Sequence, residues 1–379
     1  MDFRLTEEQR ALIDLARGLA TRHAPSPHVS WTEAGEFPWA FATDLALHGL
    51  TGIDISEERG GQGLTLLDSI LVLEAVGTVA PHLADAVQAT NFGAIREMAA
   101  FASPRLQEEV VRPALEGRSL ATIAMSEPGA GSAASHMRTR AEKSDGSVRV
   151  NGQKVFNSNG PHATHFVVWA RFGVDGDQVG ALVVPDVAPG FSRGKAERFN
   201  SGEMHCTLNF DDAQVPLEYV LLDSDGFRKM MPIFNIERLG NATRSLALGE
   251  LAFQLATDHV VERETGGHRL ASHQGLRWKL ADIRMRLDAA RLLVYRAATE
   301  LRDGVPDPLY TSIAKCYANE AGFFAANESL QLFGGYGFTP EFPLSYLLNR
   351  TRGWMIAGGS VEVLRNRIAV EILERRPTQ

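Results

Sequence analysis

The chain carries a carboxylate next to a cation, Glu237 followed by Arg238, where a long apolar helical segment is predicted to start. A carboxylate can act as a general base when removal from water raises its pKa toward the working pH. The same glutamate can equally be a residue that the positive end of a helix dipole favours. A second stretch, residues 355–362, opens the last predicted helix and contains Gly358. The two sites are 121 positions apart (358 − 237), so only the fold can bring them together.

A glycine-rich stretch lies earlier, at residues 124–132. It places Met125 and Ser126 before a turn, and Gly131 and Ser132 within that turn. Glycines allow the tight turn, and its N–H groups and serine hydroxyl can face the carbonyl groups and nitrogen of an electron-poor ring. The residues alone leave an ordinary turn between a helix and a strand equally open.

A second polar stretch, residues 151–160, begins with Asn151 and Gly152, a pair typical of a β-hairpin turn. It continues through the aromatic Phe156 to the hydroxyl of Ser158. Any hairpin would explain the first pair, so this stretch indicates a ligand site only in combination with residues 124–132.

Two glycine-rich stretches in the C-terminal half contain polar residues that could contact a ligand. Arg263 and Thr265 precede a pair of glycines, and Gln274 follows them. An arginine can bind phosphate through two parallel hydrogen bonds. Gln331 and Gly335 belong to a further glycine-rich stretch, where the backbone can approach a ligand closely. The alternatives are a solvated arginine on a helix and a helix end that binds nothing.

The elements that must position these residues change character twice along the chain. Thr6 and Gln9 form a capping-box pattern, and apolar residues follow at helical spacing. Further helices are predicted near residues 40–50 and 66–79. From about residue 121, short alternating apolar runs separated by turn residues are typical of β-strands. Apolar residues spaced by three and four then predict a long helical bundle.

We therefore predict an α+β fold that is mainly α. The predicted domains are an N-terminal helical domain (1–119), a middle β domain (120–225) and a C-terminal four-helix bundle (226–379).

Composition narrows the function classes. The 379 residues, 44% hydrophobic and 22% charged, suit a globular protein of two or three domains. A net charge of −8 argues against nucleic acid as the main partner. Two widely separated cysteines and eleven scattered histidines predict neither a disulfide framework nor a metal site. The sequence shows neither the pattern of a signal peptide nor an apolar run long enough to span a membrane. We therefore expect a cytoplasmic protein without membrane contact.

The order of the segments and their motifs resemble the acyl-CoA dehydrogenase family over essentially the whole chain. Residues 124–132 and 151–160 resemble the family's two flavin segments, and the stretches around Arg263 and Gln331 resemble those that contact the phosphates and adenosine of a neighbour's flavin. The resemblance implies FAD as the cofactor. The cofactor-binding residues that it implies are Met125, Ser126, Gly131, Ser132, Phe156, Ser158, Arg263, Thr265, Gln274, Gln331, Gly335, Ser360 and Glu362.

In most members of that family the catalytic base lies at the position of Gly358. In the branch that resembles isovaleryl-CoA dehydrogenases this position is alanine or glycine, and the base lies on the earlier helix before an arginine, where this chain has Glu237. The resemblance thus implies that Glu237 takes the α-proton and that the backbone N–H of Gly358 binds the thioester carbonyl. It also implies substrate contacts from Ser132 and Arg238.

The implied reaction is FAD-dependent α,β-dehydrogenation of an acyl-CoA or acyl-carrier-protein thioester, with the β-hydride passing to the flavin. The implied partners are an electron-transfer flavoprotein and further copies of the chain in a homotetramer, a dimer of dimers. Two alternatives stay open. One is a degenerate partner subunit of a heteromeric dehydrogenase, to which departures from the family pattern point, at Ala133, Asn157, Gly266 and Asn349. The other is a flavin oxidase or monooxygenase on the same scaffold.

Overall fold

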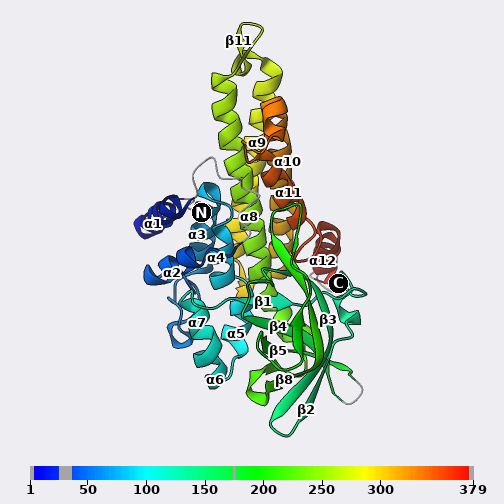
Figure 1. The fold of residues 1–379 in the computed structure, drawn as a ribbon. Helices are drawn as coiled ribbons and strands as arrows, with labels where there is room; N and C mark the ends of the chain where they lie inside the picture. Colours follow the sequence, from blue (N-terminus) through cyan, green and yellow to red (C-terminus); the bar gives the residue numbers. More distant parts are fainter. Residues whose placement is uncertain (1–3, 25–35, 174–175, 375–379) are drawn as a thin grey trace, which may run out of the picture.

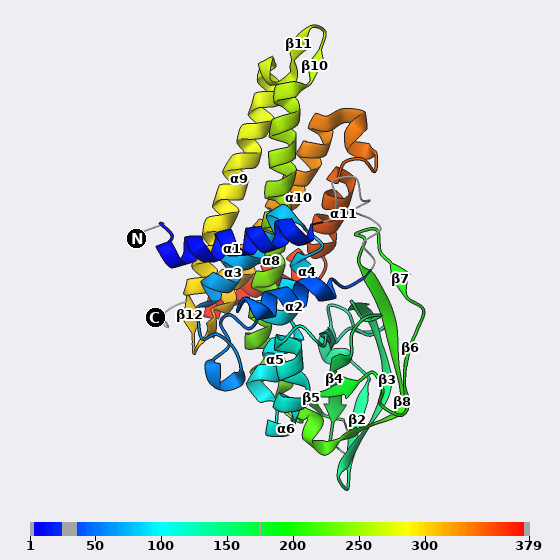
Figure 2. The ribbon, with the colours of Figure 1, turned by 60° about the vertical axis from the view of Figure 1, so that its left-hand side comes forward.

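The computed structural model describes residues 4–24, 36–173 and 176–374, and its first segment is helical (Figure 1). The predicted capping box is confirmed: Thr6 Oγ1 accepts from the backbone N–H of Gln9, and the Gln9 side chain accepts from the N–H of Thr6. Figure 2 shows α1 lying across the long helices of the bundle. The helices are α1 (Glu7–His23), α2 (Trp39–Leu47), α3 (Leu66–Val79), α4 (Ala84–Asn91), α5 (Ala94–Phe101), α6 (Pro104–Leu106) and α7 (Arg112–Leu115).

The second segment is a β-sheet, as the alternating apolar runs predicted. Among the described residues nine strands pair in one sheet of order β6-β8-β3-β2-β4-β5-β9, with β1 parallel to β4 and β7 beside β8. Its interior strands β4 and β5 are almost wholly buried, so this sheet has a core of its own. The strands are β1 (Ala121–Ala124), β2 (Arg140–Ser144), β3 (Ser147–Ser158), β4 (His165–Phe172), β5 (Gln178–Pro185), β6 (Phe191–Arg193), β7 (Glu197–Arg198), β8 (Met204–Pro216) and β9 (Val220–Leu222).

The third segment is a bundle around α8, a helix of 37 residues that runs the length of the molecule (Figure 1). The predicted apolar stripe of α9 faces the core, with Ile283, Leu287, Ala290 and Val294 buried. The helices are α8 (Gly226–Glu262), α9 (Gln274–Thr299), α10 (Pro308–Phe333), α11 (Leu344–Trp354) and α12 (Val361–Glu374). Two short hairpins, β10 (Glu264–Thr265) with β11 (His268–Arg269) and β12 (Leu301–Arg302) with β13 (Val305–Pro306), connect the long helices.

One interpretation of Glu237 is wrong. Helix α8 begins at Gly226, so Glu237 lies eleven residues (237 − 226) inside it and not at its positive end. The helix extends further back than the sequence suggested because it continues through Pro232. The helix dipole therefore does not explain this glutamate, whose surroundings must. Within the described part of the chain, no helix is long and apolar enough to cross a membrane.

Candidate active site

Glu237 is a partly buried carboxylate that receives a hydrogen bond from another segment of the chain. Gln88 on α4 donates its Nε2 proton to Glu237 Oε2 at 2.6 Å. Burial raises the pKa of Glu237 to about 7, while the charge of Arg244, this hydrogen bond and the charge of Lys315 act in the lowering direction. A carboxylate with this pKa is half ionised near neutral pH and is a much stronger base than an ordinary glutamate.

The turn between α11 and α12 contains Gly358 and contacts α8 at Arg238, the residue after Glu237. Arg238 donates from Nε to the carbonyl oxygen of Gly358 at 3.2 Å and from Nη1 to Asn235. Gly358 has a φ of +69°, which favours glycine, and a Cβ added there would lie 3.4 Å from Cε of Lys315. The fold thus brings together the two stretches that are 121 positions apart in the sequence. It also engages Arg238 within the protein, and the contact of Arg238 with a substrate stays a prediction.

Lys315 on α10 is a member of this site that the motifs missed. It is fully buried, and its ammonium group donates to the carbonyls of Trp354 and Gly359 at 3.2 and 3.0 Å. Asn319, one turn further along α10, also donates to the Trp354 carbonyl, at 2.6 Å. Burial lowers the pKa of Lys315 to about 7. No sequence signal marks Lys315, whose neighbours on α10 are a mixture of polar and apolar residues.

A second buried acid, Glu97 on α5, lies close enough to Glu237 for the charge of Glu237 to affect the pKa of Glu97. Trp169 donates to Glu97 Oε2 at 3.3 Å. Burial raises the pKa of Glu97 to about 8, opposed by the hydrogen bond from Trp169 and assisted by the charge of Glu237. Glu97 is therefore protonated at neutral pH, which avoids two negative charges near one another.

The two predicted flavin segments lie side by side. The backbone N–H of Val155 donates to the carbonyl of Ser126 at 2.9 Å. Beneath them, the buried Lys154 donates to Glu127 at 2.8 Å and to the carbonyl of Met125 at 3.0 Å. These bonds fix the first segment on strand β3, which carries the second.

The side chains beside this junction face outward. Phe156 has a φ of +58° and is 68% exposed, an unusual state for a large aromatic residue. Ser158, Gly131 and Ser132 are exposed, whereas Met125 and Ser126 are half-buried. An exposed aromatic ring next to hydroxyls and an open turn is a suitable surface for a flat ring system.

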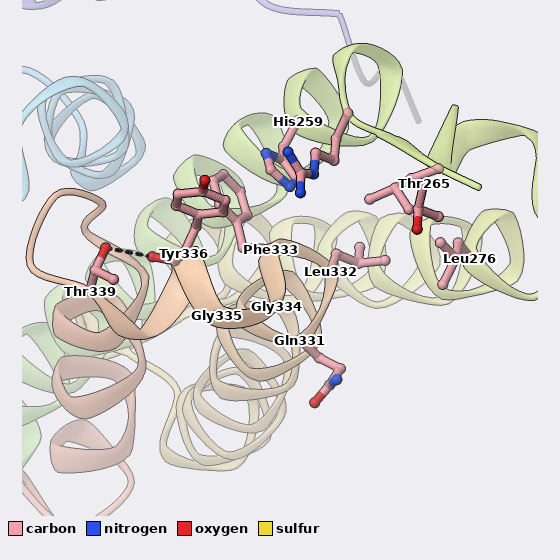
Figure 3. Close-up of a pocket in the computed structure, with 12 residues that line it drawn as sticks. His259, Thr265, Leu276, Gln331, Leu332, Phe333, Gly334, Gly335, Tyr336 and Thr339 are labelled. Atoms are coloured by element: carbon pink, nitrogen blue, oxygen red, sulfur yellow. Dashed lines mark hydrogen bonds between the residues drawn. The ribbon is translucent and has the colours of Figure 1, made fainter. Parts of the chain in front are cut away.

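The predicted phosphate and adenosine residues line a cleft of about 530 Å³ at the far end of the bundle (Figure 3). Arg263, Thr265, Gln331 and Gly335 all line it, and the guanidinium of Arg263 lies 5.6 Å from the ring centroid of Tyr336. Gln274 begins α9 and is exposed, but it is not among the residues that line this cleft.

The last two predicted cofactor residues lie at the start of α12. Ser360 accepts a 3.4 Å hydrogen bond from the N–H of Val363, as a residue that caps a helix does. Glu362 is exposed in the first turn. A cofactor contact by either residue stays a prediction.

One chain does not bring the flavin segments to the far cleft. Arg263 follows the end of α8, beside the β10–β11 hairpin, whereas Ser126 follows β1 near the other end of that helix (Figure 1). The turn at residues 124–132 suits the ring end of a flavin dinucleotide, and the cleft lined by Arg263 suits its phosphates. No described atom lies within 4 Å of a Cβ built on Gly131 or Gly335, so each turn is open to a ligand. The predicted ring-binding and phosphate-binding residues therefore lie toward different ends of one chain.

The chain matches known proteins along its whole length. The family models for the N-terminal, middle and C-terminal domains of acyl-CoA dehydrogenases match residues 6–118, 122–213 and 224–373. A 3-sulfinopropanoyl-CoA desulfinase of Paraburkholderia xenovorans (strain LB400) is 33% identical over 100% of this chain and 99% of its own length. An acyl-CoA dehydrogenase of Bacillus subtilis (strain 168) is 31% identical over 95% and 97% of the two chains. The structure of butyryl-CoA dehydrogenase from Megasphaera elsdenii superposes with a TM-score of 0.91 at 30% identity, covering 98% of this chain and 100% of that one.

Proposed function

Because the chain belongs to the acyl-CoA dehydrogenase family, whose members are flavin-dependent oxidoreductases, we propose that it oxidises the Cα–Cβ bond of an acyl thioester with Glu237 as the base. The observation that carries the proposal is a partly buried carboxylate, with a pKa of about 7, on the helix that contacts the Gly358 turn. The usual position of the family's base has no side chain in this protein, and Glu237 is the carboxylate that the fold supplies instead.

The residues of the Gly358 turn would bind the thioester. The carbonyls of Trp354, Gly358 and Gly359 are engaged by Lys315, Arg238 and Asn319, which fixes the turn from the protein side. A fixed turn presents the N–H of Gly358 to a thioester oxygen without reorganisation as negative charge develops there. Glu237 then removes the α-proton, and its raised pKa increases its affinity for that proton.

The remaining requirement is an acceptor for the β-hydride, which FAD supplies when bound. Met125, Ser126, Phe156 and Ser158 would hold the ring end. Arg263, Thr265, Gln331 and Gly335 of a second copy would hold the phosphates and adenosine. This arrangement makes a dimer the smallest complete unit.

We further propose that the assembly is a homotetramer. Helix α9 exposes Trp278, Met285 and Leu292, at 62%, 63% and 48% of their surface. Residues seven apart lie on one face of a helix, so these three form an apolar stripe that another copy would cover. As in the family resemblance, an electron-transfer flavoprotein is the proposed acceptor, and the substrate arm is CoA or an acyl-carrier protein.

The reaction is tested by the absorption spectrum of bound flavin. The purified protein is expected to carry FAD, and an acyl-CoA is expected to bleach its absorption in the absence of oxygen. In Glu237→Gln the flavin remains and bleaching falls by at least about a thousandfold, because the α-proton has no acceptor. Glu58→Gln is the control, since Glu58 is exposed in the short turn before α3 and lies outside the proposed site. Bleaching of Glu237→Gln at near the unmodified rate would show that another group is the base.

The same measurement separates the alternatives. A protein that neither carries nor takes up FAD would be a partner subunit, and a reduced flavin that reacts rapidly with oxygen would indicate an oxidase or monooxygenase. A panel of acyl-CoAs, including 3-sulfinopropanoyl-CoA, defines the substrate.

The cation beside Glu237, Arg244, already pairs with Asp85 and Glu203, so it is not free to bind a sulfinate. We therefore expect electron transfer to an acceptor rather than sulfite release.

A further inference from the structure

The carboxylate of Glu237 is contacted from outside its own helix by one amide. Gln88 is buried on α4, and its Nε2 lies 2.6 Å from Glu237 Oε2. Among the described residues it is the one side chain found to hydrogen-bond Glu237. The bond joins the N-terminal helices to the bundle across 149 residues of sequence, so it depends on the packing of α4 against α8.

A glycine makes this contact possible. Gly240 lies one turn after Glu237 on α8, and a Cβ built there would lie 2.8 Å from Gln88 Nε2 and 2.8 Å from Cγ of Phe92. Real Cβ atoms do not approach other atoms so closely, and glycine inside a helix is otherwise unfavourable. The missing side chain at 240 provides the space into which the amide of Gln88 fits.

The other ionisable groups around Glu237 are engaged elsewhere. Arg244 on α8 pairs with Asp85, and Lys315 on α10 donates to two carbonyls of the Gly358 turn. Glu97 on α5 accepts from Trp169. Arg244 and Lys315 act on Glu237 through charge, whereas Gln88 donates a hydrogen bond that also fixes the direction in which the carboxylate points.

We propose that Gln88 is the positioning residue of the catalytic base, which aims the Glu237 carboxylate and favours its ionised form. The inference rests on the proposed function of Glu237. An amide N–H binds an oxygen of the charged carboxylate more strongly than an oxygen of the neutral acid, so loss of the donor favours the protonated acid. Gln88 therefore keeps a carboxylate that burial would neutralise available for proton removal.

The test is the pH dependence of kcat/KM for an acyl-CoA that the enzyme oxidises. In Gln88→Met, which keeps the length of the side chain and removes the donor, the acid limb is expected to move up by about one pH unit. Activity at pH 6 then falls about tenfold, and activity at pH 9 stays within about twofold. Gly240→Ala is expected to give the same shift, because the new methyl group displaces the amide.

Gln107→Met is the matched control. Gln107 also donates from Nε2, to the carbonyl of Arg59, but within the N-terminal helices. The Gln107→Met variant should leave the acid limb of the pH profile unchanged. A uniform loss of activity at every pH in both test variants, with an unmoved acid limb, would mean that Gln88 only packs α4 against α8. If Glu237→Gln retains activity, the proposed base itself fails. If Glu237→Gln is inactive while the Gln88 variants have unmoved limbs, only this inference fails.

Discussion

At the scale of single residues, the site depends on placing ionisable groups where their usual charge is unfavourable. Burial raises the pKa of Glu237 to about 7 and lowers that of Lys315 to about 7. Each shift means that the folded protein disfavours the charged form of that group relative to water. Such groups are typical of catalytic sites, where stability is lower so that reactivity is higher.

Glu237 should therefore destabilise the folded protein at neutral and higher pH. Its folded pKa of about 7 lies above the usual 4.5, so the folded state binds a proton more tightly than the unfolded state. This loss of folding stability is absent at low pH, grows above pH 4.5 and is complete above pH 7. Because the side chain is only partly buried, we expect Glu237→Gln to stabilise the protein by about 2 kcal/mol at pH 8 and about 0.5 kcal/mol at pH 5. Chemical denaturation at the two pH values measures this difference.

Glu58→Gln again serves as the control, with an expected change within about 0.5 kcal/mol at both pH values. Equal stabilisation by Glu237→Gln at pH 5 and pH 8 would mean that the effect does not come from ionisation of Glu237.

At the scale of elements, the flavin segments are held by one buried ion pair. Lys154 on β3 pairs with Glu127, which also accepts from the backbone N–H groups of Arg138 and Thr139. Lys154→Met leaves Glu127 buried without its cation and should cost about 3 kcal/mol of folding stability. Because the same lysine fixes the carbonyl of Met125, bound FAD should also dissociate more readily. Denaturation and flavin absorbance after dialysis measure the two effects.

The matched control is an ion pair at the protein surface. Arg149→Met removes a pair with Glu142 on the same hairpin, 3.5 Å apart at the surface, and should change stability by less than about 0.5 kcal/mol. Unchanged flavin retention in Lys154→Met would show that the turn at residues 124–132 does not depend on this lysine.

The sequence predicted the elements better than it predicted the contacts between them. Periodicity located α3, the β segment and the buried stripe of α9, because local patterns determine which face of an element is buried. The family resemblance predicted that residues 124–132 and 151–160 belong to one site, and the backbone bond between Val155 and Ser126 joins these two stretches. Gln88 and Lys315 carry no motif. The Gln88 contact spans 149 residues of sequence and the Lys315 contacts span 39 and 44, and local patterns do not encode packing at such separations.

At the scale of the whole molecule, charge also links the three segments. Asp85 on α4 and Glu203 beside β8 both pair with Arg244 on α8 and with Arg350 on α11. Arg244 lies seven residues after Glu237, on the same face of α8, and Asp85 lies one turn before Gln88. Polar contacts therefore join α4 to α8 at two levels, at Gln88 and at Asp85. The position of the base therefore depends on all three segments being correctly assembled.

The separation of the two predicted flavin-contact regions within one chain also predicts that one active site needs residues from two chains. If Arg263 completes the flavin site of a neighbour, Glu237→Gln and Arg263→Glu damage different sites in a mixed dimer. One site then has both changes, and the other has neither. Co-expressed Glu237→Gln and Arg263→Glu chains should therefore recover about a quarter of the unmodified activity, since half of the dimers are mixed and each has one intact site.

The two variants purified separately should be inactive for different reasons. Glu237→Gln retains flavin without turnover, and Arg263→Glu loses flavin because a negative charge repels the phosphates. The double variant co-expressed with itself is the control and should stay inactive. If Arg263 instead served the site of its own chain, every site in a mixed dimer would carry one damaging change. Mixing would then restore nothing, so the complementation measured in the mixture decides between a shared and a self-contained site.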